Sequence, residues 1–193
     1  MNMTDINRQV GVSCSEKDGS HNGKGGVTAG KIVAIVLFIL LGAALVIVLT
    51  QPIFRIYGDT MSPNLKDGDI VVALKDDTPE PGDVAAIDFN SKILVRRIIA
   101  VGGDQVEIDE DGNVSVNGKA LDEPYLKEKS LGECDISFPY GVPDGMLFVM
   151  GDNRNEAPDS RLEEIGCVSD DQICGKIVFC VWPLSDFGIV KGI

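Results

Sequence analysis

A stretch of 18 residues without a charge, residues 32–49, constrains this chain more than any other feature of its sequence. A helix of that length rises about 27 Å and covers most of a bilayer's hydrocarbon core, which is about 30 Å thick. A cleaved secretory signal and a buried core helix are the alternatives. A cleaved signal would have a shorter apolar region behind a shorter leader and small residues at its end, whereas Thr50-Gln51-Pro52 follows this stretch. We therefore predict one transmembrane helix over residues 32–50, retained as an anchor.

Flanking charges predict the orientation of this helix. Short cytoplasmic segments favour Lys and Arg, whereas long translocated domains tolerate acidic residues. Residues 1–50 contain four basic and three acidic residues; subtracting these from the totals of 17 and 30 leaves 13 basic and 27 acidic residues in the rest of the chain. We expect residues 1–31 to form a flexible cytoplasmic tail and residues 51–193 to form one extracytoplasmic domain. The predicted location is the plasma membrane, with a single pass.

The composition excludes several function classes. A formal net charge of -13 argues against nucleic acid as a partner, because phosphates attract a basic surface. The sequence has neither a CxxC motif nor a His-Cys cluster, and its acidic turn at residues 109–112 lacks the closing Glu of a calcium loop. We predict no metal site and no cofactor.

The cysteines leave two interpretations open. Cys14 precedes the apolar stretch and would stay reduced in the cytosol. Cys167 and Cys174 are separated by six residues in a predicted loop and are the candidates for a local disulfide, with Cys134 and Cys180 left over. Buried free thiols are the alternative.

Beyond Pro52, the pattern changes to short β-type runs separated by Gly, Pro and Asp. The predicted strands are residues 70–73, 84–87, 93–101 and 106–108. Val114 and Val116 alternate with polar residues and predict a hairpin with the last of these strands, and Asn117-Gly118 predicts a further tight turn. The predicted fold class is mainly β.

Three motifs follow one another in this β-rich part. Residues 58–65 read Gly-Asp-Thr-Met-Ser-Pro-Asn-Leu, residues 95–104 read Val-Arg-Arg-Ile-Ile-Ala-Val-Gly-Gly-Asp, and residues 151–161 read Gly-Asp-Asn-Arg-Asn-Glu-Ala-Pro-Asp-Ser-Arg. Their order and content resemble the bacterial type I signal peptidase family, whose members are membrane peptidases with a Ser-Lys dyad. The resemblance extends over about residues 32–184. It implies an antiparallel signal-peptidase-like β domain attached to one N-terminal transmembrane helix.

The resemblance implies a position for each motif residue. Thr60 occupies the nucleophile position and Arg96 the position of the catalytic lysine, the general base. The remaining motif residues are Met61, Ser62, Pro63, Arg97, Gly151, Asp152, Asn153, Arg154, Ala157, Asp159, Ser160 and Arg161. Arg97 is expected to pair with Asp152, and Asp159 with Arg161. Ala157 stands where the family often has a serine that helps to position the lysine.

The family's reaction is hydrolysis of an amide bond in an exported pre-protein by a serine that a neutral lysine activates. Arg96 cannot be that base, because a guanidinium has a pKa above 12 and no acceptor lone pair. Thr60 keeps a hydroxyl but adds a β-methyl group that crowds it. His21 is predicted on the other side of the membrane, and Lys92 would lie about 13 Å from Arg96 along a strand. Ser62, as a shifted nucleophile, would also lack a base.

Two functional hypotheses follow from these substitutions. In the first, peptidase activity is lost or severely impaired, and the protein is a peptide-binding assembly or chaperone factor for an exported pre-protein or a pilin-type polypeptide. Family members without the dyad are associated with surface pilus assembly in some Gram-positive bacteria. In the second, the protein is an active signal peptidase with Thr60 as its nucleophile. Self-cleaving repressor-like proteins, which share a Ser-Lys β fold, need an N-terminal DNA-binding domain, and the apolar stretch stands in its place.

The resemblance also implies an apolar surface that dips into the outer leaflet of the membrane. Phe54, Ile56 and Tyr57 follow the predicted anchor and are candidates for that contact. Ordinary core packing is the alternative for these three side chains.

Overall fold

The computed structural model describes residues 29–75, 80–190 and 192. The chain forms two compact units, Met1–Ala44 and Leu45–Ile193. Cys14, His21 and residues 1–28 of the predicted cytoplasmic tail lie outside the described residues. The candidate site residues fall within them.

The predicted N-terminal helix is present as α1 (Ala29–Thr50), which has 22 residues. It begins three residues before the uncharged stretch. Proline is absent from this segment and leucine and alanine are frequent, which favours a continuous helix. Counting only the residues that the structure describes, no helix is long and apolar enough to cross a membrane.

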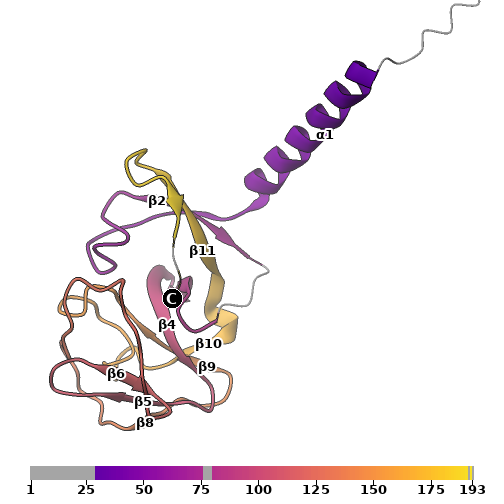
Figure 1. Ribbon diagram of the computed structural model, residues 1–193. Coiled ribbons are helices and arrows are strands. Elements are labelled where there is room, and N and C mark those ends of the chain that lie inside the picture. The colour runs from indigo at the N-terminus through magenta and orange to yellow at the C-terminus, as the bar shows by residue number, and fades with distance from the viewer. Residues whose placement is uncertain (1–28, 76–79, 191, 193) are drawn as a thin grey trace, which may run out of the picture. The chain divides into compact units, whose positions relative to one another are not determined.

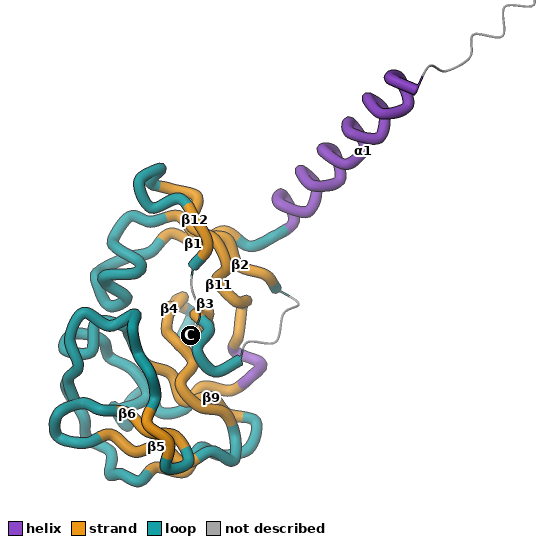
Figure 2. The backbone as a smooth tube through the Cα atoms, in the orientation of Figure 1, coloured by secondary structure: helices purple, strands orange, loops and turns teal. Residues whose placement is uncertain are grey.

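The larger sheet of the second unit is antiparallel and has eight strands (Figures 1 and 2). Its strand order is β1-β2-β11-β3-β4-β9-β10, and β12 pairs with β11 beside this path. The strands are β1 (Ile53–Arg55), β2 (Ile70–Leu74), β3 (Val84–Phe89), β4 (Lys92–Val101), β9 (Met146–Met150), β10 (Val168–Ser169), β11 (Ile173–Trp182) and β12 (Gly188–Ile189). A single 3-10 turn, η1 (Asp170–Gln172), connects β10 to β11.

The smaller sheet has four strands in the order β7-β6-β5-β8. They are β5 (Gln105–Ile108), β6 (Val114–Val116), β7 (Lys119–Ala120) and β8 (Tyr140–Gly141). The pairing of β5 with β6 is antiparallel, so the hairpin expected there is confirmed. Asn117 and Gly118 have φ values of 52° and 73° and form the expected tight turn between β6 and β7. The mainly β fold class is confirmed.

Three clusters of buried apolar side chains form the core. The first contains Met61 and Leu65 together with residues of β2, β3 and β11. Both side chains come from the loop between β1 and β2, and both are almost fully buried. This burial ties the loop to the sheet and so determines where the intervening residues lie.

The three candidates for membrane contact have different environments. Ile56 is 4% exposed and belongs to the first core cluster, and Phe54 packs partly against the same cluster. Tyr57 is 75% exposed. Core packing therefore accounts for Ile56 and Phe54, and Tyr57 alone of the three remains an exposed side chain.

The cysteines of the described part are free thiols, so a local disulfide between Cys167 and Cys174 is not present. Cys167 packs against the cluster that contains Ile99 and Phe148, whereas Cys174 packs against the cluster that contains Ile56. Their spacing in the sequence suggested a loop. In the structure, β10 and the turn η1 lie between them and take them to different parts of the core.

Candidate functional site

Thr60 lies in the turn that connects β1 to β2. The turn is closed by a hydrogen bond from the Ser62 amide to the Asp59 carbonyl at 3.0 Å, and the buried Met61 side chain anchors it. The carbonyl oxygen of Thr60 accepts a hydrogen bond from the Asn153 amide at 3.0 Å. This bond connects the first motif to the third, 93 positions further along the chain.

Arg96 points at Thr60 from strand β4, where it pairs with Ala85 of β3. Its Nη1 donates to the hydroxyl oxygen of Thr60 at 2.9 Å and to the carbonyl oxygen of Val95 at 2.5 Å. Its Nε and Nη2 donate to the carbonyl oxygen of Pro158 at 3.1 and 2.8 Å. The structure therefore brings Thr60 and Arg96, the residues expected at the nucleophile and base positions, into direct contact.

The pair between Arg97 and Asp152 is confirmed and is buried on both sides. Two parallel hydrogen bonds of 2.8 and 2.7 Å join the guanidinium to the carboxylate, and Nη1 of Arg97 also donates to the carbonyl oxygen of Gly82. The Tyr125 ring lies 4.0 Å from the guanidinium carbon. Bidentate pairs of this type fix orientation as well as distance. This pair therefore holds β4 against the third-motif loop, the loop after β9 that contains residues 151–161.

The pair between Arg161 and Asp159 is also confirmed, with both side chains fully buried and a distance of 2.8 Å. Asp159 additionally accepts a hydrogen bond from the Gly151 amide at 2.9 Å. Ser160 accepts one from the Val149 amide at the same distance. These motif residues therefore organise the backbone of the third-motif loop.

A third buried pair joins Arg154 to Glu123. Glu123 and Tyr125 come from the loop after β7, and the Tyr125 hydroxyl donates to Glu123 at 2.9 Å. No local feature of the sequence indicates a role for Glu123, Tyr125 or Pro158. Nothing local in the sequence connects Glu123 to an arginine 31 positions away.

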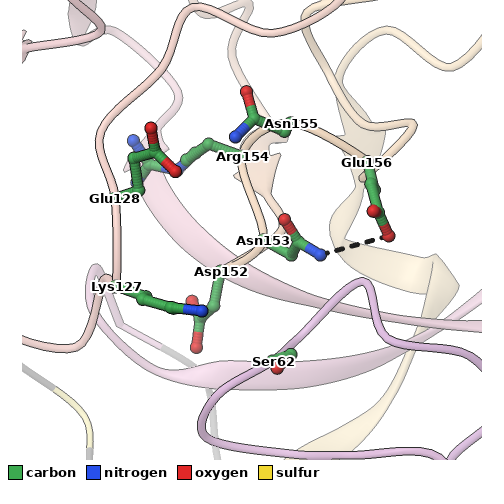
Figure 3. Close-up of a pocket in the computed structure, with 8 residues that line it drawn as sticks. All are labelled: Ser62, Lys127, Glu128, Asp152, Asn153, Arg154, Asn155 and Glu156. Atoms are coloured by element: carbon green, nitrogen blue, oxygen red, sulfur yellow. Dashed lines mark hydrogen bonds between the residues drawn. The ribbon is translucent and has the colours of Figure 1, made fainter.

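Two pockets adjoin these residues. Thr60 and Arg96 line a pocket of about 260 Å³, together with Arg55, Ile56, Tyr57, Met61, Ile93, Leu94, Val95 and Pro158. Ser62 lines a different pocket of about 220 Å³, together with the exposed Lys127 and several residues of the third motif (Figure 3). A hydrogen bond of 3.3 Å between Asn153 and Glu156 crosses one side of that second pocket.

The signal peptidase, peptidase S26, family model matches residues 29–182. This chain belongs to the signal peptidase family. The matched segment includes all three motifs and the strands that connect them. The expected family membership is therefore confirmed.

This chain is similar to known signal peptidases over most of its own length. Signal peptidase IB of Staphylococcus aureus (strain COL) is 36% identical over 175 residues, covering 80% of this chain and 87% of the relative. Signal peptidase I of Bacillus licheniformis is 32% identical over 168 residues, with the same coverage. The crystal structure of a signal peptidase I from Enterococcus faecalis V583 is 28% identical and covers 52% of this chain and 97% of that chain, with a TM-score of 0.45.

In this signal peptidase family member, Arg96, the residue expected at the base position, is a buried cation. Desolvation lowers the pKa of Arg96 to about 10, and the negative charge of Asp159 opposes that effect. The guanidinium still keeps its proton at neutral pH. Because all its nitrogen-bound hydrogens are donors, it holds the hydroxyl oxygen of Thr60 as an acceptor and cannot take the hydroxyl proton.

Ser62 does not provide the missing chemistry either. Among the residues that the structure describes, no hydrogen bond joins Ser62 to Lys127, the lysine of its pocket (Figure 3). Lys127 is exposed, whereas a lysine that acts as a base at neutral pH is one that burial has removed from water.

Ala157 lies next to the site, as expected from its motif position. Its side chain is buried, and the Cβ that a residue larger than glycine would have at Gly151 falls 2.2 Å from the Ala157 Cβ. The methyl group has no polar atom, so it orients neither Thr60 nor Arg96. Within the described residues, no group of three or more potential metal ligands is present.

Proposed function

We propose that this signal peptidase family member binds signal-peptide-like segments of exported pre-proteins without cleaving them at an appreciable rate. The observation that carries the proposal is the hydrogen bond from Nη1 of Arg96 to the Thr60 hydroxyl oxygen. A working dyad needs a neutral amine that accepts the proton of the nucleophile. Here the group in that position is a protonated donor, so the hydroxyl is positioned but not activated.

An open strand edge next to Thr60 supports peptide binding. Strand β9 pairs with residues 97–101 of β4, whereas among the described strands only β3 pairs with the earlier residues, 92–96. Ile93, Leu94 and Val95 on this segment line the same pocket as Thr60. An extended peptide can add to such an edge through main-chain hydrogen bonds, with its side chains in the neighbouring apolar pocket.

We further propose that residues 32–50 form a transmembrane anchor in the plasma membrane, with the N-terminus cytoplasmic and residues 51–193 outside. The uncharged run and the charge distribution of the sequence support this topology. Exposed apolar side chains on and around β1, β11 and β12 support a second membrane contact. These are Ile53, Tyr57, Trp182, Leu184, Phe187 and Ile189.

For the cellular role, we propose assembly of a surface polymer such as a pilus, with a pilin-type polypeptide as client. The support is the resemblance to dyad-lacking family members associated with that process. Deletion of the gene is expected to impair polymer assembly, and a chromosomal Thr60→Ala copy is expected to complement the deletion. Failure of that copy to complement, at normal protein levels and with peptide binding retained, would contradict a non-proteolytic role.

The cleavage assay uses the purified full chain in detergent and a labelled pre-protein with a small-residue cleavage site. We expect no specific cleavage. The matched positive control is the triple variant Thr60→Ser, Arg96→Lys, Ala157→Ser, which returns the family's groups to all three positions. Specific cleavage by the unmodified chain that disappears in Thr60→Ala would overturn the proposal.

An active peptidase with Thr60 as nucleophile is the second candidate. The observation in its favour is the 36% identity to a protein named signal peptidase IB, with the third motif and its ion pairs in place. It requires a proton acceptor other than Arg96. The same assay separates the two candidates, because only this one predicts cleavage that depends on the Thr60 hydroxyl.

A further inference from the structure

Arg96 differs from the other buried arginines of this domain in its partners. Arg97 has Asp152 at 2.7 Å, Arg161 has Asp159 at 2.8 Å, and Arg154 is paired with Glu123. All four hydrogen bonds of Arg96 end on uncharged oxygens, those of Thr60, Val95 and Pro158. Asp159, the carboxylate with the largest effect on Arg96, is already engaged by Arg161.

A buried charge without a partner is costly, so proteins usually pair it. Arg96 is 2% exposed, yet it lines the pocket of about 260 Å³ that opens beside Thr60. The other charged residue of that lining is Arg55, and no acidic residue contributes to it. In a chain with a net charge of -13, this pocket is therefore a site of positive charge.

Hydrogen-bond donors remain available at the same place. A guanidinium has five N–H groups, and the four hydrogen bonds of Arg96 leave one N–H of Nη2 without an acceptor. Thr60 Oγ1 accepts from Arg96, so its own proton is free to donate. Among the described residues, the backbone N–H of Thr60 also has no acceptor. Two residues that line the pocket thus retain three unused donors.

We propose that this pocket binds the free C-terminal carboxylate of an extended peptide. The inference rests on the proposed function, peptide binding at the β4 edge, and specifies which part of a peptide Arg96 recognises. The peptide lies along residues 93–95 of β4 and ends at Arg96 and Thr60. Its terminal carboxylate supplies the counter-charge that Arg96 lacks.

The charge distinguishes a chain end from an internal peptide bond. An internal carbonyl is neutral and leaves the Arg96 cation without a counter-ion, whereas a terminal carboxylate forms charge-assisted hydrogen bonds with the same donors. The peptide that remains after a signal sequence has been cut has such an end, with small residues before it. The ligand class is therefore a cleaved peptide with small, uncharged C-terminal residues.

The test compares two fluorescent peptides of one sequence, ending in Ala-Ser-Ala, one with a free C-terminal carboxylate and one with a C-terminal amide. Both are titrated with the full chain in detergent micelles, and the dissociation constants are measured by fluorescence anisotropy. We expect the carboxylate form to bind roughly 10- to 100-fold more tightly, the ratio that a hydrogen-bonded charge typically supplies. The comparison needs no variant, so it does not depend on the folding of a mutant.

Two variants locate the effect. Arg96→Gln is expected to abolish the preference for the carboxylate, and Lys92→Gln is expected to keep it. Lys92 belongs to the same strand, is exposed and is absent from the pocket lining, so its substitution changes the net charge equally. Circular dichroism of both variants verifies that they are folded.

The outcomes separate carboxylate recognition from peptide binding in general. Equal binding of the two peptides, or a preference that survives in folded Arg96→Gln, would overturn carboxylate recognition and leave peptide binding intact. If neither peptide binds, the proposed function of peptide binding is wrong, and carboxylate recognition is wrong as well. A preference lost equally in Lys92→Gln would show general attraction between opposite charges and would also overturn it.

Discussion

At the scale of single residues, the exchange of lysine for arginine at position 96 changes the chemistry although it conserves the charge. A buried lysine can lose its proton and become a base, whereas burial lowers the pKa of Arg96 only to about 10. Arg96 also reaches further and donates in several directions at once, to Thr60, Val95 and Pro158. It therefore places a planar group of donors where the sequence resemblance predicts the base.

The protonation of Arg96 leads to a prediction for the pH dependence of peptide binding. The charged groups that act on it are Asp159, Arg161 and Asp152, which are held in buried ion pairs, and Arg55 lines the same pocket. The positive charge of Arg96 is complete below its pKa and is lost as the pH rises through about 10. Affinity for the carboxylate peptide should thus stay constant between about pH 6 and about pH 9 and weaken above that.

The measurement is the same anisotropy titration, repeated across this range with circular dichroism to verify the fold at each pH. A neutral lysine at this position would titrate near pH 7 and produce a change within the range. A marked change in affinity between about pH 6 and about pH 9 would contradict the assignment of Arg96 as the anion-binding group.

At the scale of elements, the loop after β9 lies in close contact with the turn after β1. An added Cβ at Gly151 would lie 2.2 Å from the Ala157 Cβ and 2.7 Å from the Thr60 carbonyl oxygen. Both distances are too short for a real side chain, and the second involves backbone. The glycine is therefore required for the close approach of these two segments, and not for an unusual φ angle.

We predict that Gly151→Ala destabilises the protein by about 1–3 kcal/mol, the usual cost of overpacking, and weakens peptide binding by displacing Thr60. The control is Gly141→Ala in β8, where an added Cβ has no neighbour within 4 Å. Thermal unfolding of the solubilised chain, followed by circular dichroism, measures the difference. A Gly151→Ala variant as stable as the Gly141→Ala variant would contradict the packing seen here.

The three buried ion pairs belong to the same scale. The resemblance implied two of them, because both partners of each lie in recognised motifs. The third, between Arg154 and Glu123, involves a loop outside the motifs and was missed. From the sequence alone, a carboxylate in a loop is expected to be a solvated surface group. Only the fold shows that Glu123 is buried.

At the scale of the whole molecule, the proposed topology predicts how the chain behaves in cells. In intact protoplasts, external protease should digest a tag at the C-terminus and spare a tag at the N-terminus, because residues 51–193 are proposed to lie outside and residues 1–31 inside. The full chain should also stay in the membrane fraction after alkaline carbonate treatment. Digestion of the N-terminal tag in intact protoplasts, with a cytosolic marker protected, would rule out this orientation.

The sequence by itself determined the features that depend on neighbours in the chain. Helix α1 follows from a continuous apolar run, the hairpin of β5 and β6 from period-two alternation, and family membership from motif order. The absence of a base at position 96 follows from the chemistry of arginine in any fold. These properties are local, so no contact between distant residues is needed to infer them.

The tertiary structure decided which charges are buried together and which have no counter-charge. Arg96 contacts Thr60, 36 positions earlier, and Pro158, 62 positions later. Cys167 and Cys174, close in sequence, pack in different core clusters. Burial and pairing depend on how distant segments fold against each other. For that reason, only the fold shows Arg96 as an uncompensated cation lining a pocket beside Thr60.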